Sequence, residues 1–220
     1  MPFKKIITIF FFLYTSLISA QTILMNEHIN NQTYVNTWKI SPSKNGFIIN
    51  GSTNFESVTI HTDSDYNTIK WKLIRPQDNV NITASRTKNI ITIKGVHYNQ
   101  SINKALEIDS TAWIQLPGLQ LSTFIKSTKD STTRWILSWD KLDKNMMKFN
   151  KVTTHKALII NNNSLKSTEV LMKPTGYKGL FWSANLWFDP TTGLYQKYSG
   201  PRGGLKSPKT LVELRKIINN

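Results

Sequence analysis

The chain has 220 residues, no cysteine and a formal net charge of +15. The lack of cysteine excludes disulfides, thiolate catalysis and cysteine-ligated metals, so packing alone has to hold the fold together. The positive charge favours anionic partners such as phospholipid head groups or acidic glycans, although lysines dispersed along a chain are also typical of an ordinary solvated surface.

The N-terminus has the pattern of an export signal. A short basic start precedes an almost unbroken apolar run over residues 6–17, and the segment ends in the small residue Ala20. This run is too short for an ordinary transmembrane helix. We expect residues 1–20 to be a signal peptide, whose removal takes away two lysines and no acid and leaves a charge of +13. Residues 21–220 are expected to form a single β-barrel-like domain in the periplasm or outside the cell.

Short apolar–polar alternation recurs between residues 33 and 199. In one segment, Ile69, Trp71 and Leu73 share a face, and lysines occupy the other. Such period-two patterning is typical of antiparallel strands with one wet face. Asparagine–glycine dipeptides and short polar clusters separate about a dozen strand candidates. We therefore predict an all-β fold: a curved antiparallel sheet forming a barrel or half-barrel, with one or two short helices.

Two segments depart from the alternation. Apolar residues in the segment 121–125 fall at i, i+3 and i+4, which predicts one or two helical turns. Apolar residues in the segment 209–218 fall at i, i+3 and i+7, which favours a short C-terminal helix. An edge strand through Leu211 and Val212 is the alternative for this second segment.

The most distinctive internal stretch is an aromatic hairpin. Its first strand is predicted over residues 180–188. A turn follows in which a proline fixes φ at the start and Gly193, at the end, supplies a left-handed conformation. Alternation places Trp182 on the core face and Trp187 on the opposite face. We expect Trp187 to pair with Tyr195 across the hairpin.

A large aromatic ring on the wetter face of a sheet has two interpretations. It can belong to a second layer of core, or it can line a cleft and pack on an acyl chain or a sugar. The chain has seven tryptophans, which favours a lined cleft. The candidate ligand-binding residues are four of these tryptophans and two arginines that could contact an anion: Trp71, Trp113, Trp182, Trp187, Arg134 and Arg202.

Four segments carry a resemblance to other proteins through their residues and their order in the chain: 108–115, 135–139, 186–194 and 198–204. Together they resemble an uncharacterised family of exported bacterial β-rich proteins, over about residues 33–214. The hairpin is also similar to the last strands of half-barrel carriers of the lipoprotein-sorting type. Such carriers bind acyl chains in a curved antiparallel sheet covered by helices, so this resemblance implies a lipid-like ligand.

Groups suited to catalysis are few. None of the four histidines pairs at metal-ligand spacing, and no nucleophile-elbow motif occurs, so we expect no metal and no cofactor. Asp109, Asp140, Asp143 and Asp189 could include a carboxylate pair for glycoside hydrolysis. Lysines flank Trp71, but neighbouring strand residues point to opposite faces, which argues against a stacking platform for nucleic acid.

These observations favour an exported, non-catalytic, monomeric protein that binds an apolar or amphipathic, lipid-like ligand in a Trp-lined cleft. One alternative is a carbohydrate-active enzyme that uses paired carboxylates. Another is a basic surface-interaction protein that binds an anionic surface, glycan or polymer. We expect no transmembrane anchor after removal of the signal peptide.

Overall fold

The computed structural model describes residues 20–139, 147–160, 166–201 and 209–219. Residues 1–19 of the expected signal peptide, together with Asp140, Asp143 and Arg202, lie outside the described residues.

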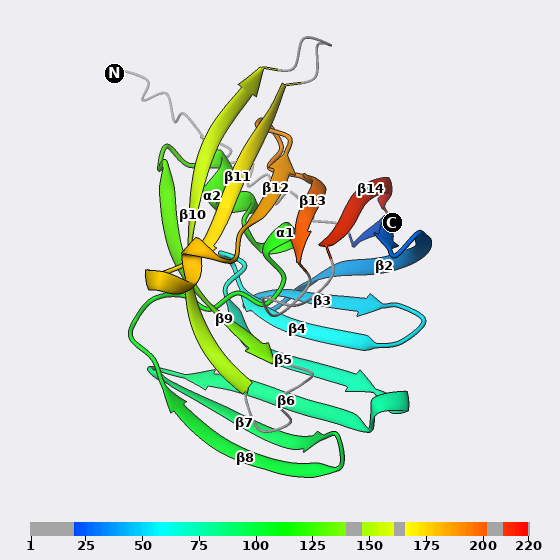
Figure 1. The fold of residues 1–220 in the computed structure, drawn as a ribbon, viewed down its shortest axis with the longest axis vertical. Helices are drawn as coiled ribbons and strands as arrows, with labels where there is room; N and C mark the ends of the chain where they lie inside the picture. Colours follow the sequence, from blue (N-terminus) through cyan, green and yellow to red (C-terminus); the bar gives the residue numbers. More distant parts are fainter. Residues whose placement is uncertain (1–19, 140–146, 161–165, 202–208, 220) are drawn as a thin grey trace, which may run out of the picture.

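Fourteen strands form one continuous antiparallel sheet that curves around an interior (Figure 1). The first eight strands are β1 (Gln21–Ile29), β2 (Gln32–Ser43), β3 (Gly46–Ser52), β4 (Ser57–Asp63), β5 (Thr68–Arg75), β6 (Val80–Thr87), β7 (Ile90–His97) and β8 (Gln100–Glu107). The other six are β9 (Ser131–Trp139), β10 (Met147–Ile160), β11 (Lys166–Pro174), β12 (Ala184–Phe188), β13 (Tyr195–Pro201) and β14 (Lys209–Asn219). The predicted all-β fold is confirmed.

The strands follow one another around the sheet almost in chain order. The order is β8-β7-β6-β5-β4-β3-β2-β1-β14-β13-β12-β11-β10-β9, so the first and last strands pair with each other. The sheet is open between its edge strands β8 and β9. Residues 108–130 connect these two strands, and we call the part of the structure where residues 108–116 run between β5–β8 and β9 the seam.

Short helical turns fill part of the interior and connect strands. They are α1 (Pro117–Gln120), α2 (Ser122–Lys126), and the 3-10 turns η1 (Pro76–Asp78) and η2 (Gly176–Leu180). The helical turn predicted over residues 121–125 is confirmed by α2. Within the described part of the chain, no helix combines the length and the apolar character needed to cross a membrane.

The segment 209–218 is a strand, so the prediction of a C-terminal helix is wrong. β14 pairs with β1 on one side and β13 on the other, so it is also not an edge strand. The β1–β14 pairing contains a bulge, which leaves Arg215 without a partner residue. As a result Leu214 and Ile217, which both pack against the core, lie three residues apart. The residues that gave the helical spacing therefore do not share one face, since Leu214 packs against the core and Ile218 is exposed.

A second bulge changes the predicted face of Ile69. In the β4–β5 pairing His61 faces Lys70 and Thr62 faces Thr68, so Ile69 is the extra residue. Its side chain is exposed, whereas Thr68 is buried in its place. Trp71 and Leu73 are buried as predicted.

The core lies between the inner face of the sheet and the two α-helices. Ile49, Ile60 and Ile82 from the sheet are fully buried, and so is Leu121 between α1 and α2. Figure 1 shows α1 and α2 inside the curve of the sheet. We call α1 and α2 together, residues 117–126, the plug.

Candidate functional site

The structure brings two of the predicted ligand-binding tryptophans into one core. Trp71 on β5 and Trp113 at the seam are 2% and 0% exposed. Trp182, just before β12, is partly buried and packs against the same core. Trp187 does not join them, because it lies on the other face of β12, where the Nζ atom of Lys197 is 5.7 Å from its ring.

The predicted pairing of Trp187 with Tyr195 is wrong. Trp187 faces Lys197, and Phe188 faces Tyr195, because a bulge between these pairs shifts the register of β12 and β13. The rings of Phe188 and Tyr195 meet edge to face with centroids 5.9 Å apart. The hairpin also begins later than predicted, since β12 starts at Ala184.

The turn of the hairpin is built as predicted, around Asp189 and Gly193. Gly193 has a φ of 69°. The Asp189 carboxylate accepts hydrogen bonds from the backbone N–H groups of Thr191 and Thr192, at 2.9 and 2.7 Å. These bonds, led by the one from Thr192, lower the pKa of Asp189. This carboxylate therefore has a structural role as the cap of a turn.

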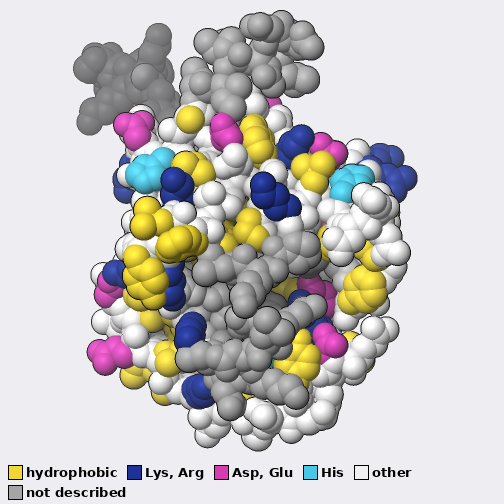
Figure 2. All heavy atoms as spheres, in the orientation of Figure 1, with side chains coloured by type: hydrophobic (Ala, Val, Ile, Leu, Met, Phe, Trp, Pro, Cys, Tyr) yellow, Lys and Arg dark blue, Asp and Glu magenta, His cyan; other side chains and the backbone are white. Residues whose placement is uncertain are grey.

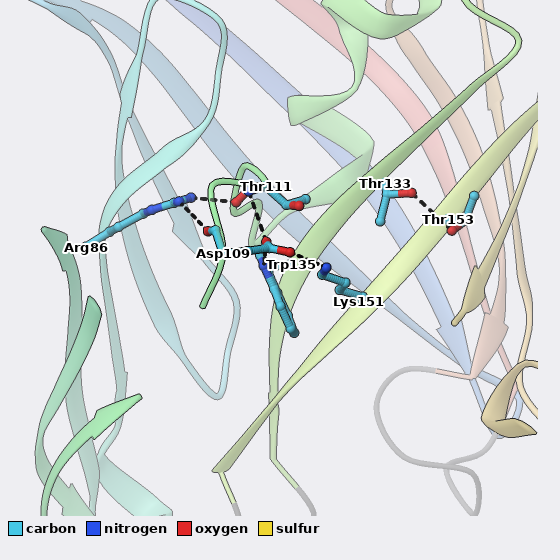
Figure 3. A network of polar contacts seen from close by, with 7 residues as sticks. All are labelled: Arg86, Asp109, Thr111, Thr133, Trp135, Lys151 and Thr153. Atoms are coloured by element: carbon cyan, nitrogen blue, oxygen red, sulfur yellow. Dashed lines mark hydrogen bonds and ion pairs between the residues drawn. The ribbon is translucent and has the colours of Figure 1, made fainter. Parts of the chain in front are cut away.

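Asp109 is the centre of a polar network at the seam (Figure 3). One carboxylate oxygen accepts hydrogen bonds from the Trp135 indole at 2.8 Å and from the Thr111 backbone N–H at 3.0 Å. The other oxygen forms an ion pair with Lys151. The hydrogen bond from Lys151, followed by those from Thr111 and Trp135, lowers the pKa of the Asp109 carboxyl far below its usual value. Asp109 thereby joins the loop to β9 and β10.

Arg86 on β6 attaches the same loop to the other half of the sheet. Its guanidinium donates hydrogen bonds to the backbone carbonyls of Thr111 and Asp109, at 2.8 and 3.0 Å (Figure 3). Lys151 also lies 5.0 Å from the ring of Trp135. We call the set Arg86, Asp109, Trp135 and Lys151 the latch, because it connects β6 with β9 and β10 across the seam.

Backbone hydrogen bonds of Trp113 also connect the two halves of the sheet across the seam. Trp113 forms a parallel bridge with Trp135 on β9, and its carbonyl accepts a hydrogen bond of 2.7 Å from the N–H of Thr68 on β5. The ring of Trp113 meets Phe149 edge to face, with centroids 5.8 Å apart. Trp113 is therefore held from both halves of the sheet.

Gln120 on α1 anchors the plug. Its side chain is buried; the carbonyl oxygen accepts from the backbone N–H groups of Gln115 and Leu116, at 2.7 and 2.6 Å. Its amide donates to the carbonyl of Tyr66 at 2.6 Å and to the Thr68 hydroxyl at 2.9 Å. A buried amide satisfied in this way fixes the position of α1 relative to β5.

Two open surface hollows lie away from the predicted tryptophans. One, of about 390 Å³, is lined by residues such as His28 and Thr210. The other, of about 370 Å³, lies beside the latch and includes Asp63 and Arg86. Arg134 on β9 is close to Asp63, whose charge opposes the lowering of the Arg134 pKa by burial. The predicted residues thus do not converge on one hollow.

The latch and Gln120 were not predicted as a unit from the sequence. Asp109 was a candidate only as a carboxylate for catalysis, and the structure engages it in the latch, on a different loop from Asp189. Among the described residues, no group of three or more histidine or acidic side chains is placed to hold a metal ion. The arrangement holds in place the segment that fills the interior.

Comparisons with known proteins place the fold. No protein-family model matches the chain, and no curated protein is significantly similar to it. Among solved structures, the chain is similar to a β-barrel-like protein of a domain of unknown function, DUF1849, from Brucella abortus. The TM-score is 0.58 at 8% identity, over 92% of this chain and 98% of that chain. This likeness shows a shared β-barrel-like fold.

A further match is an outer membrane lipoprotein-sorting protein domain from Vibrio parahaemolyticus. It covers 92% of this chain and 86% of that chain at 8% identity, but the TM-score is 0.25.

Proposed function

We propose that the protein is an exported, non-catalytic binding protein that takes an apolar or amphipathic, lipid-like ligand into the interior of the curved sheet. The observation that carries the proposal is the plug. Much of the inner face of the sheet is apolar, although it also carries buried polar side chains such as Glu27 and Asn36. The short segment that packs on it buries Leu119, Leu121, Phe124 and Ile125 there. The plug thus occupies the volume that a ligand would need.

The plug is suited to being displaced. Its helices have only four and five residues, which is too short for helices to persist without tertiary contacts. Its position therefore depends on its packing and on the polar contacts at the seam. A ligand that offers comparable apolar surface to the sheet can replace the packing.

The latch contains a solvent-exposed ion pair, which is the contact that we expect to break first when the plug is displaced. In the Asp109–Lys151 ion pair, 49% of the Asp109 side chain and 32% of the Lys151 side chain are exposed, so water and salt can replace much of the attraction. The latch joins β6 to β9, so its opening would remove the side-chain contacts that hold residues 109–111. The backbone bonds of Trp113 to β5 and β9 would then be the next connection to break. We infer that the ligand enters at the seam and contacts Trp71 and Trp113.

Energy transfer from tryptophan to a dansyl-labelled fatty acid tests this proposal. We expect saturable transfer below the micelle concentration of the probe, and a weaker signal in Trp113→Phe. Trp187→Phe is the matched control, because Trp187 lies on the other face of β12, and it should keep the wild-type signal. The absence of transfer with dansyl fatty acids and lysophospholipids of several chain lengths would reject the proposal.

For the export step, we expect periplasmic protein to begin at Gln21, which N-terminal sequencing checks.

A further inference from the structure

Three large apolar side chains project from the turn between β11 and β12. Tyr177, Leu180 and Phe181 are 74%, 81% and 71% exposed, and we call them the tip. They lie on or directly after η2 (Figure 1). The strand predicted from residue 180 is here replaced by a 3-10 turn that points these side chains outward. Exposed apolar residues are common singly, but a cluster at this exposure indicates a contact surface.

Contacts with β10 and with the core fix the position of the η2 turn, so the fold itself keeps the tip exposed. The Thr175 N–H donates to the carbonyl of Lys151 at 2.9 Å, and the Lys178 ammonium donates to the Asn150 side chain at 2.9 Å. The backbone N–H of Trp182 donates to the Lys178 carbonyl at 3.2 Å, and the Trp182 ring packs against the core. The tip is thus presented on a fixed base beside β10.

The segment of the chain that carries the tip has only basic charges. Lys173 and Lys178 flank it, and no acidic residue occurs between residues 170 and 188. Figure 2 shows a hydrophobic cluster on the side of the molecule where η2 lies, with basic and acidic side chains beside it. The chain as a whole carries +15, or +13 after loss of residues 1–20. Apolar side chains beside lysines are suited to the surface of an anionic bilayer, where the apolar groups can insert and the lysines can contact lipid phosphates.

We propose that the tip inserts into the surface of an anionic lipid bilayer. Leu180 and Phe181 enter the acyl region, Tyr177 stays at the level of the head groups, and Lys173 contacts lipid phosphates. A small convex tip suits a fluid bilayer, since a rigid protein partner needs a matching surface of roughly 800 Å² for stable binding. This proposal does not depend on a ligand in the interior of the sheet.

A single fluorophore on the tip tests the insertion directly. Because the chain has no cysteine, Leu180→Cys labelled with the environment-sensitive dye NBD reports from one position. We expect its emission to shift to the blue and to intensify with phosphatidylcholine vesicles that contain about one quarter phosphatidylglycerol. Phe55→Cys with the same label is the matched control, because Phe55 is also exposed but lies in the β3–β4 connection, and its emission should stay unchanged.

Vesicle sedimentation of a tip variant gives the second measurement. Tyr177→Ser, Leu180→Ser and Phe181→Ser in one chain should lower the partition coefficient by about tenfold or more, because the apolar contribution to binding is lost. The double variant Phe55→Ser and Ile90→Ser removes two exposed apolar side chains elsewhere on the surface and should sediment like the wild type. Thermal unfolding of each variant checks that the fold is retained.

Specific outcomes overturn the proposal. Equal sedimentation of the tip variant and the wild type would show that the tip contributes nothing. An unchanged dye emission at position 180 on vesicles that do bind the protein would place another surface at the membrane. Concentration-dependent association without lipid, lost in the tip variant, would assign the tip to a second copy of the chain. A fatty acid that binds the interior in the tip variant as in the wild type separates this proposal from the preceding one.

Discussion

Leu121→Ala on the plug separates displacement of the plug from ligand binding to a fixed structure. Leu121 is fully buried, its N–H donates to the Pro117 carbonyl, and its own carbonyl accepts from Ile125. Truncation of a fully buried leucine costs about 2–5 kcal/mol of unfolding free energy through lost packing and the cavity left behind. The backbone hydrogen bonds stay intact, so the cost falls on packing between the plug and the sheet.

The same change is expected to tighten ligand binding. Leu121 contacts the core only while the plug is in place, so its loss destabilises the closed state relative to the open state. If 2 kcal/mol of the cost falls on this equilibrium, the apparent dissociation constant drops by about 30-fold. Urea unfolding measures the first effect, and titration with the dansyl-labelled fatty acid measures the second.

Leu73→Ala is the matched control for this experiment. Leu73 lies on β5, is 1% exposed, and belongs to the sheet whether the plug is open or closed. It should lose a similar amount of stability without any gain in affinity. The reasoning is refuted if Leu121→Ala is destabilised but binds the probe no more tightly than Leu73→Ala.

Two further predictions concern the sheet and the latch. Gly51→Ala should lower the unfolding free energy by about 1–3 kcal/mol and the melting temperature by about 2–12 °C, because an added Cβ would lie 2.2 Å from the ring of Trp38. Calorimetry measures both effects. The control variant Ser52→Ala should melt like the wild type. Asp109→Asn should melt below the wild type at neutral pH because the ion pair with Lys151 is lost. The pKa of Asp109 is lowered in the folded state, so this stabilisation is complete above the unfolded pKa of about 3.9 and is lost as the pH falls below it. A difference in melting temperature that stays constant down to pH 2 would contradict the assignment.

Local patterns predicted the elements well wherever pairing was regular. The alternation around Trp71 and Leu73 correctly predicted a strand with both side chains buried, and the turn at Gly193 formed as expected. The predictions failed where bulges interrupt the pairing: Ile69 changed face, and the segment predicted as a C-terminal helix is β14, whose pairing with β1 is interrupted at Arg215. A bulge depends on the partner strand, so spacing within one strand does not reveal it.

The candidate site was only partly predictable for a related reason. The count of tryptophans indicated an aromatic interior, and Trp71 and Trp113 do share one core. The latch joins β6, β9 and β10, and its members Arg86 and Lys151 are 65 positions apart in the chain. Residues so far apart have no spacing that signals their contact, so Asp109 was recognised only as an isolated acid.

Period-two alternation and composition act locally, so they were enough to predict an all-β sheet with an apolar inner surface, a chain without covalent cross-links, and a strongly basic character. They could not predict where the sheet stays open, that a short segment fills its interior, or that the tip faces outward. These features come from pairing between distant strands, in which Trp113 contacts both β5 and β9, and the path of the chain around the sheet sets which residues meet.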